Sequence, residues 1–279
     1  MIMRIRRSRS VIGMVLFVFC LTGCAWQDQL SAEESFNRAL SGLSGVDNFS
    51  FRGEAAIRSG ENGPFQQSLA FEGNLQHHTD LTLSSRNKGT TIRNDKDKVY
   101  ADSVYQADGL TVSLKRKEGK WSTLSSGHVE EMWITRLNPL ELLEYIGNSE
   151  KTVTQELGAA RGTKVLRIEL SPEAAAQMVY GSLDEQMKTL AERIERKGDP
   201  LYSEDPKVRK RLKAVWERDY NEMKSMLSKA DTVSVSHVTI NQKKQLPTKL
   251  TMERTLFFVD EQGKTRTETL LSDVTFTGY

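Results

Sequence analysis

Several long segments of the chain alternate apolar and polar residues with a period of two. In the first of them, residues 49–58, the apolar side is formed by Phe49, Phe51, Ala55 and Ile57. Because successive side chains of a strand point to opposite faces, this pattern predicts an antiparallel strand with one buried face. A sheet built from such strands needs a second layer that covers its apolar face.

Similar segments recur through most of the chain. We predict further strands around residues 69–75, 81–83, 99–104, 110–114, 121–124, 151–157, 163–170, 232–240, 248–259 and 266–276. Short stretches with turn-forming residues, such as 59–64 and 117–120, separate neighbouring strands. Hairpins between consecutive strands are therefore expected, and the sheet is predicted to be a meander.

Helical patterns interrupt this meander. Residues 33–43 predict a short N-terminal helix. Residues 138–147 predict a second helix, with Asn138 as its cap, Pro139 in its first turn and Gly147 as its stop. Both helices are expected to help cover the apolar face of the sheet.

Two longer helices are predicted at about 172–197 and 205–229, with a break at Gly198, Asp199 and Pro200. Each has one apolar stripe opposite a densely charged face, so the two can pack as an antiparallel pair that leans on the sheet. The stripes consist of Val179, Leu183, Met187, Leu190 and Ile194 in the first helix and Val208, Leu212, Trp216, Met223 and Leu227 in the second.

Residues 1–23 have the three regions of a signal peptide. Four arginines between Arg4 and Arg9 precede an uncharged apolar run at 11–21, which is too short to span a bilayer as a permanent helix. The leader is therefore predicted to be removed, which leaves the mature chain outside the cytoplasm.

Leu21, Thr22, Gly23 and Cys24 at the end of the leader resemble the lipobox of bacterial lipoproteins. The resemblance implies that Cys24 is lipidated and that acyl chains, palmitate among them, anchor the protein to the extracytoplasmic face of the cell membrane. Residues 24–32 would then form a lipidated tether. The alternative is an ordinary secretory signal peptide with an incidental thiol.

Composition argues against two features. The chain has 39 basic and 37 acidic residues, so its charge gives no indication of nucleic-acid binding. Its two cysteines are Cys20, in the leader, and Cys24, so no disulfide is expected in the mature chain.

Sequence signatures of catalysis or metal binding are not found. His77 and His78 are adjacent and would point to opposite faces of a strand, so they could not bind one metal ion together. His128 and His237 match no His-Glu-x-x-His spacing. Residues 94–98 alternate acids with lysines and predict a hairpin turn rather than a calcium loop. We therefore expect no metal, no cofactor and no enzymatic activity.

The order of these elements is similar to that of the LolA/LppX superfamily of lipoprotein carriers and lipid-binding lipoproteins. The resemblance rests on the short first helix, the meander, the Asn-Pro-Leu-x-Leu-Leu helix from Asn138, and the late pair of strands joined through residues 238–250. It implies an α+β fold in which one strongly curved antiparallel sheet forms an open half-barrel covered by helices. Residues 33–279 would form this single domain, with the long helical hairpin inserted at about 172–230. The competing architecture, a two-sheet sandwich, would show shorter strands and no long helical insertion.

Two functions remain open at this level. In the first, the concave face binds a lipid or another hydrophobic ligand in a cavity lined by Phe49, Phe51, Leu69, Phe71 and Leu110, although these residues could instead form a filled core. In the second, the chain is an envelope interaction or regulatory lipoprotein, in maintenance, sporulation or signalling, whose helical pair docks a protein partner. An open apolar pocket would favour the first function, and an exposed apolar stripe on the helices would favour the second.

A basic run lies near the start of the second long helix. It consists of Lys207, Arg209, Lys210, Arg211 and Lys213. The run could face anionic lipid head groups, or it could be a solvated helix face neutralised by neighbouring acids.

Overall fold

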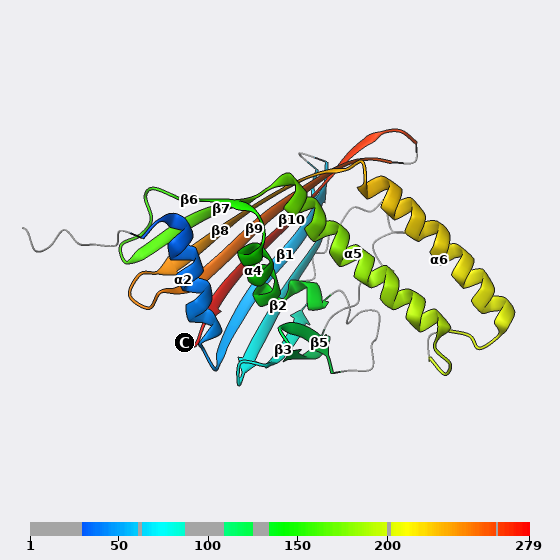
Figure 1. Cartoon of the computed structure of the whole chain (residues 1–279), viewed down its shortest axis with the longest axis horizontal. Helices are drawn as coiled ribbons and strands as arrows, with labels where there is room; N and C mark the ends of the chain where they lie inside the picture. Colours follow the sequence, from blue (N-terminus) through cyan, green and yellow to red (C-terminus); the bar gives the residue numbers. More distant parts are fainter. Residues whose placement is uncertain (1–29, 61–62, 87–108, 125–133, 200–201, 261) are drawn as a thin grey trace, which may run out of the picture.

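The computed structural model describes residues 30–60, 63–86, 109–124, 134–199, 202–260 and 262–279. Within them, ten strands form one antiparallel sheet in the order β5-β4-β3-β2-β1-β10-β9-β8-β7-β6 (Figure 1). The strands are β1 (Phe49–Ser59), β2 (Phe65–Gln76), β3 (Asp80–Arg86), β4 (Thr111–Lys117), β5 (Lys120–Thr123), β6 (Lys151–Gln155), β7 (Thr163–Leu170), β8 (Asp231–Asn241), β9 (Leu246–Val259) and β10 (Thr265–Thr277). The predicted meander is thus confirmed, and pairing of β1 with β10 joins its two ends into one sheet.

The sheet curves around a layer of helices, and its edge strands β5 and β6 do not pair with each other (Figure 1). The helices in the described chain are α2 (Ala32–Ser44), α4 (Pro139–Asn148), α5 (Pro172–Glu195) and α6 (Pro206–Leu227), with a short 3-10 helix η1 (Thr135–Leu137) before α4. The architecture is the α+β open half-barrel that the sequence predicts.

The apolar faces of the strands meet on the concave side of the sheet. Phe51 of β1 lies opposite Phe276 of β10, and Val238 of β8 lies opposite Leu250 of β9. All four side chains are buried in one cluster with the inner faces of α2 and α4. The alternation read from the sequence therefore decides which residues form the core, because a half-buried strand places every second side chain inside.

Helix α4 begins as predicted but ends differently. The side chain of Asn138 accepts a hydrogen bond from the backbone amide of Leu140, as expected of a cap. The prediction that Gly147 stops the helix is wrong, because α4 continues to Asn148. The glycine instead allows close approach of α2, since a Cβ at Gly147 would lie 2.8 Å from Cδ1 of Leu40.

Helices α5 and α6 form the predicted antiparallel pair, which projects beyond the sheet (Figure 1). The side chains of Ser171 and Asp205 cap their N-termini. Between the helices, Nε1 of Trp216 donates to the carbonyl oxygen of Met187 at 2.7 Å. Helix α5 packs on β8, and the side chain of Ala175 in its first turn is fully buried in the core of the half-barrel. The start of the hairpin therefore belongs to the core.

Some predicted features lie outside the described residues. These are the leader, the lipobox residues Leu21, Thr22, Gly23 and Cys24, the tether at 24–32 up to residue 29, the strand at 99–104, the turn at 94–98 and His128. His77 and His78, expected on a strand, lie in the turn between β2 and β3 with φ of 52° and 60°. The His78 ring lies against the carboxylate of Asp47 there.

Candidate binding face of the half-barrel

The predicted ligand-lining residues are mostly gathered on the concave face. Phe49, Phe51, Phe71 and the partly buried Leu110 belong to one apolar cluster, whereas Leu69 is buried outside it. The rings of Phe51 and Phe71 meet edge to face, with their centroids 6.5 Å apart. The structure therefore brings four of the five together in a packed arrangement, and their role in ligand binding stays a prediction.

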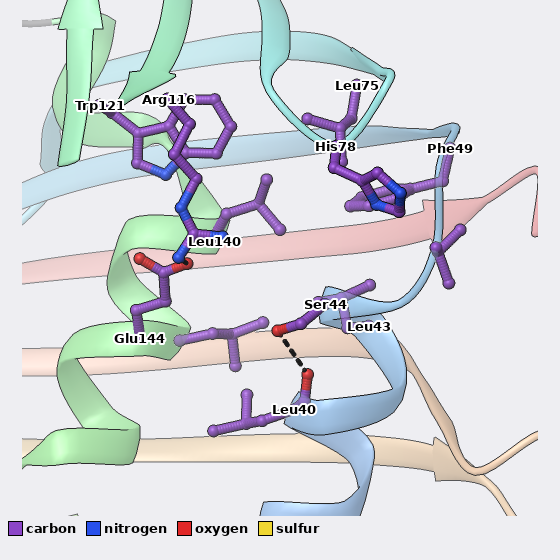
Figure 2. A pocket seen from close by; sticks show the side chains of 12 residues that line it. Leu40, Leu43, Ser44, Phe49, Leu75, His78, Arg116, Trp121, Leu140 and Glu144 are labelled. Atoms are coloured by element: carbon purple, nitrogen blue, oxygen red, sulfur yellow. Dashed lines mark hydrogen bonds and ion pairs between the residues drawn. The ribbon is translucent and has the colours of Figure 1, made fainter. Parts of the chain in front are cut away.

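An apolar cleft of about 60 Å³ lies at the edge of this cluster (Figure 2). Leu40 and Leu43 from α2 and Leu140 from α4 line one side of the cleft, and Phe49 and Leu75 from the sheet line the other. The cleft is thus formed where the two cover helices meet the strands.

Polar groups stand at the opening of this cleft. Nη2 of Arg116 on β4 lies 2.6 Å from Oε1 of Glu144 on α4, and the Arg116 guanidinium lies 5.9 Å from the centroid of the Trp121 ring. Burial raises the pKa of the Glu144 carboxyl, and the positive charge of Arg116 opposes this rise. The ion pair therefore links α4 to the sheet across the opening.

A second hollow, of about 30 Å³, lies between the sheet and the segment formed by η1 and α4. Leu137 and Leu142 line it from the helical side, and Met252, Leu270 and Val274 line it from β9 and β10. Sites that enclose drug-sized ligands measure about 300–1,000 Å³. Neither hollow in the described chain reaches that size, so an acyl chain would fit only after a cover helix moves.

The cover helices are attached to the sheet by side chains. No backbone hydrogen bond joins α2 or α4 to a strand within the described ranges. Besides apolar packing, two lysines of the sheet hold α2. Nζ of the buried Lys164 donates to Oγ of Ser35 at 2.8 Å, and Nζ of Lys151 lies 5.9 Å from the centroid of the Phe36 ring. Movement of α2 away from the concave face would therefore break no backbone hydrogen bond of the sheet.

The part of the concave face near the start of β8 is polar. Thr232, Ser234 and Ser236 are buried there, on the strand that α5 covers. On β9, Arg254 lies opposite Ser234, whereas Leu256 and Met252 lie opposite Thr232 and Ser236. None of these residues was predicted as a site from the sequence, although Arg254 continues the inward-facing series that begins with Leu250.

The outer helix α6 has no fully buried side chain. Val208, which the sequence places on the packing stripe, is 37% exposed, and Val215 is 47% exposed. The stripe prediction is wrong for Val208 because the turns around Trp216 and Tyr220, whose rings stack, carry the contact with α5.

The basic run of α6 is only partly neutralised. Nζ of Lys213 lies 2.7 Å from Oε1 of Glu195, and Arg209 donates to the carbonyl oxygen of Ser203. The remaining cations form no ion pair with the described part of the chain; they are Lys207, Lys210 and Arg211. The run is therefore neither a fully neutralised helix face nor, on these contacts alone, a binding site.

Neither a metal cluster nor a membrane-crossing helix is found where the chain is described. Among these residues, no three His, Cys, Asp or Glu side chains are grouped so that they could hold a metal ion. His237 lies in β8, as predicted, with Nε2 3.8 Å from Oε1 of Glu156. No described helix is long and apolar enough to cross a membrane.

Comparisons with known proteins give matches only among solved structures. No family model and no curated protein matches the chain. A lipovitellin chain, described for its lipid–protein interactions, matches with 8% identity and a TM-score of 0.38 over 83% of this chain. The match covers 25% of the lipovitellin chain, so this chain spans a quarter of that length.

Two bacterial structures match over nearly their whole length. A LolA superfamily protein from Nitrosomonas europaea matches with 10% identity and a TM-score of 0.26, over 89% of this chain and 92% of that one. The LolA/LppX resemblance of the sequence predicts a match of this kind. A putative outer membrane lipoprotein-sorting protein domain from Vibrio parahaemolyticus matches with 8% identity and a TM-score of 0.21, over 89% and 95%.

Proposed function

We propose that the chain is a lipoprotein of the cell envelope, anchored through Cys24, that binds an acyl chain or a similar apolar ligand on the concave face of its half-barrel. The observation that carries this proposal is the apolar concave face, which is covered by α2 and α4; no backbone hydrogen bond among the described residues ties these two helices to the sheet. Two of the matching structures carry names that refer to lipid–protein interactions and to lipoprotein sorting, and such a ligand is consistent with both names. Catalysis is not part of the proposal.

The ligand would enter by displacing a cover helix. The clefts of about 60 and 30 Å³ are too small for an acyl chain, yet both are apolar and both border α4. Leaving the concave face would expose the apolar side of α2, and an acyl chain taking its place would cover the sheet again. Binding and helix displacement are therefore coupled in this proposal.

Photo-cross-linking tests this function directly. The full chain, purified in amphipol, is exposed to a diazirine-bearing fatty acid, and labelled peptides are identified by mass spectrometry. Labels should fall on α2, α4 and the concave sides of the strands. Labels spread equally over the outer face of α6 would contradict the proposal, as would lipid extraction that recovers no bound lipid from the purified protein.

A pair of leucine substitutions sharpens the test. Leu143 lines the cleft of about 60 Å³, whereas the equally buried Leu166 belongs to the core but does not line the cleft. Replacement of either by alanine removes similar apolar volume and costs about 2–5 kcal/mol of stability. Only Leu143→Ala enlarges the cleft, so only this variant should show increased labelling.

A second candidate function is docking of a protein partner through α6. The exposed Val208 and Val215 beside an incompletely neutralised basic run favour it. In that case, in-cell cross-linking from a position on α6 should give one defined adduct that Val215→Glu abolishes, while the same substitution leaves fatty-acid labelling unchanged.

A further inference from the structure

Arg254 lies on the concave face of β9, where most neighbours are apolar or uncharged. Its cross-strand partners are Ser234 on β8 and Leu270 on β10. Side chains at such opposed positions have Cβ atoms about 4.5–5.5 Å apart, so the guanidinium and the Ser234 hydroxyl share one small region. The side chain of Arg254 is partly buried there.

Neither polar side chain forms a hydrogen bond or an ion pair within the described part of the chain. Arg254 makes no hydrogen bond or ion pair with the described residues. The carboxylate of Glu268 acts on the guanidinium only through its charge. Burial lowers the pKa of the Arg254 guanidinium, and Glu268 opposes this shift. Ser234 is 2% exposed, and its Oγ has no hydrogen-bond partner among the residues that the structure describes. Unpaired groups of this kind are costly to bury, so such a site favours an incoming counter-charge.

An apolar hollow is lined by residues next to this pair. The hollow beneath η1 and α4 is lined by Met252 and Leu270, which are the inward-facing neighbours of Arg254 along β9 and across to β10. Arg136, on the helical side, lines the same hollow. A molecule with an apolar body in the hollow would therefore reach a guanidinium and a hydroxyl at one end.

We propose that Arg254 and Ser234 form a head-group site for the carboxylate or phosphate of an anionic amphiphile whose tail lies under α4. A guanidinium can donate two parallel hydrogen bonds to such a group, and the Ser234 hydroxyl can donate a third. This inference rests on the proposed function, because it specifies the ligand of the same concave face. It predicts selection for anionic over neutral amphiphiles.

The test compares two probes that differ only at the head group. The full chain in amphipol is labelled with diazirine-bearing hexadecanoic acid or with the corresponding hexadecanol. Arg254→Met should reduce labelling by the acid about tenfold, the loss expected for a charge-assisted hydrogen bond, and should leave labelling by the alcohol unchanged. Arg254→Lys should retain part of the acid labelling. Arg52→Met, on the exposed convex face of β1, is the matched control and should change neither.

Thermal melting distinguishes a binding role from a structural one. Neither substitution breaks a hydrogen bond or an ion pair of the described residues, so Arg254→Met and Ser234→Ala should melt at or above the temperature of the unsubstituted chain. Ser234→Ala should still lower acid labelling severalfold. A lower melting temperature for both variants, together with equal loss of acid and alcohol labelling, would show that the two residues serve the fold and would overturn the inference.

Two further outcomes separate the possible errors. Equal acid labelling of the unsubstituted chain and Arg254→Met would overturn the head-group site while the concave-face function stands. Absence of labelling by either probe would overturn both. A third outcome would assign the site to a free anion and not to a lipid head group. In that case inorganic phosphate would raise the melting temperature of the unsubstituted chain but not of Arg254→Met, and Arg254→Met would still bind the acid normally.

Discussion

The ring of Phe51 lies against the backbone of Gly73 on the neighbouring strand. The two residues are cross-strand partners, and a Cβ built at Gly73 would lie 2.2 Å from Cζ of Phe51. A second pair has the strands exchanged: the ring of Phe71 on β2 lies against its cross-strand partner Gly53 on β1. Two glycines therefore make room for the two rings that form the centre of the concave face.

Gly73→Ala should destabilise the protein. The added methyl group overlaps the Phe51 ring, and such overpacking typically costs about 1–3 kcal/mol. Gly181→Ala in α5 is the matched control, because the nearest atom to its new Cβ, on Gln177, lies 3.8 Å away. Alanine there should stabilise the helix by about 0.5–1 kcal/mol. Urea unfolding of both variants checks the opposite signs, and equal effects would contradict the role of Gly73.

Phe71→Ala should cost about 3–5 kcal/mol, as expected for a ring removed from a packed core. Phe71 is 3% exposed, whereas Phe65 on the same strand is 43% exposed. Phe65→Ala should therefore change stability by less than about 1 kcal/mol. The midpoints of chemical unfolding measure the difference. If both variants lost equally little stability, Phe71 would border open space, and the concave face would be a pocket without any movement of the helices.

The local parts of this fold could be predicted because they depend on short-range physics. Period-two alternation identified the inward side of β1, and the polar side chains of Asn138 and Ser171 marked helix starts where backbone amides need acceptors. Pairing of β1 with β10 could not be read in this way. Alternation specifies which side of a strand is buried, but not which distant strand lies beside it.

The candidate site was harder to predict for a related reason. Arg254 lies on the same side of β9 as Leu250 and Met252, which would have placed it inside. A charged residue in an alternating strand, however, usually marks the solvent side. Gly147 was misread as a stop because only the approach of Leu40 from α2 shows why a glycine is needed inside α4. Both errors concern contacts between segments far apart in the sequence.

The stability of the helical hairpin should decrease at acidic pH. Asp184 on α5 accepts hydrogen bonds from Lys188 and from Tyr220 of α6, and these lower the pKa of the Asp184 carboxyl below its usual 3.8. A lowered pKa contributes stability that is complete above the unfolded value and is lost as the pH falls through the folded value. Asp184→Asn should therefore be less stable than the unsubstituted chain near neutral pH, and the difference should shrink below about pH 3.8. Circular dichroism melts across this range test it, and a constant difference would refute the assignment.

Cys24→Ala should release the protein from membranes without unfolding it. Cys24 lies outside the described residues, ahead of the capped start of α2, so the substitution removes only the expected attachment point for acyl chains. Cys20→Ala, in the leader, is the control and should leave membrane retention unchanged. Membrane fractionation after a salt wash measures both. Complete sedimentation of Cys24→Ala would show that lipidation is not what holds the chain.

Shortening the helical hairpin should have two different effects, depending on where the cut is made. Met187 and Trp216 lie side by side, so joining Met187 to Arg218 through a short glycine-rich linker removes the outer half of the hairpin without pulling on the rest. This outer half contains its own buried ion pair between Arg193 and Asp199, 3.1 Å apart.

A longer deletion that joins Leu170 to Asp231 also removes the start of α5. It uncovers the inward side of β8 and eliminates Ala175, which is fully buried, and Val179, which is 8% exposed. The short deletion should keep a cooperative melt close to that of the full chain, because the buried contacts it loses lie within the hairpin. The long deletion should keep strand-rich circular dichroism but melt at a clearly lower temperature. Equal melting temperatures for the two variants would show that α5 adds nothing to the core of the half-barrel.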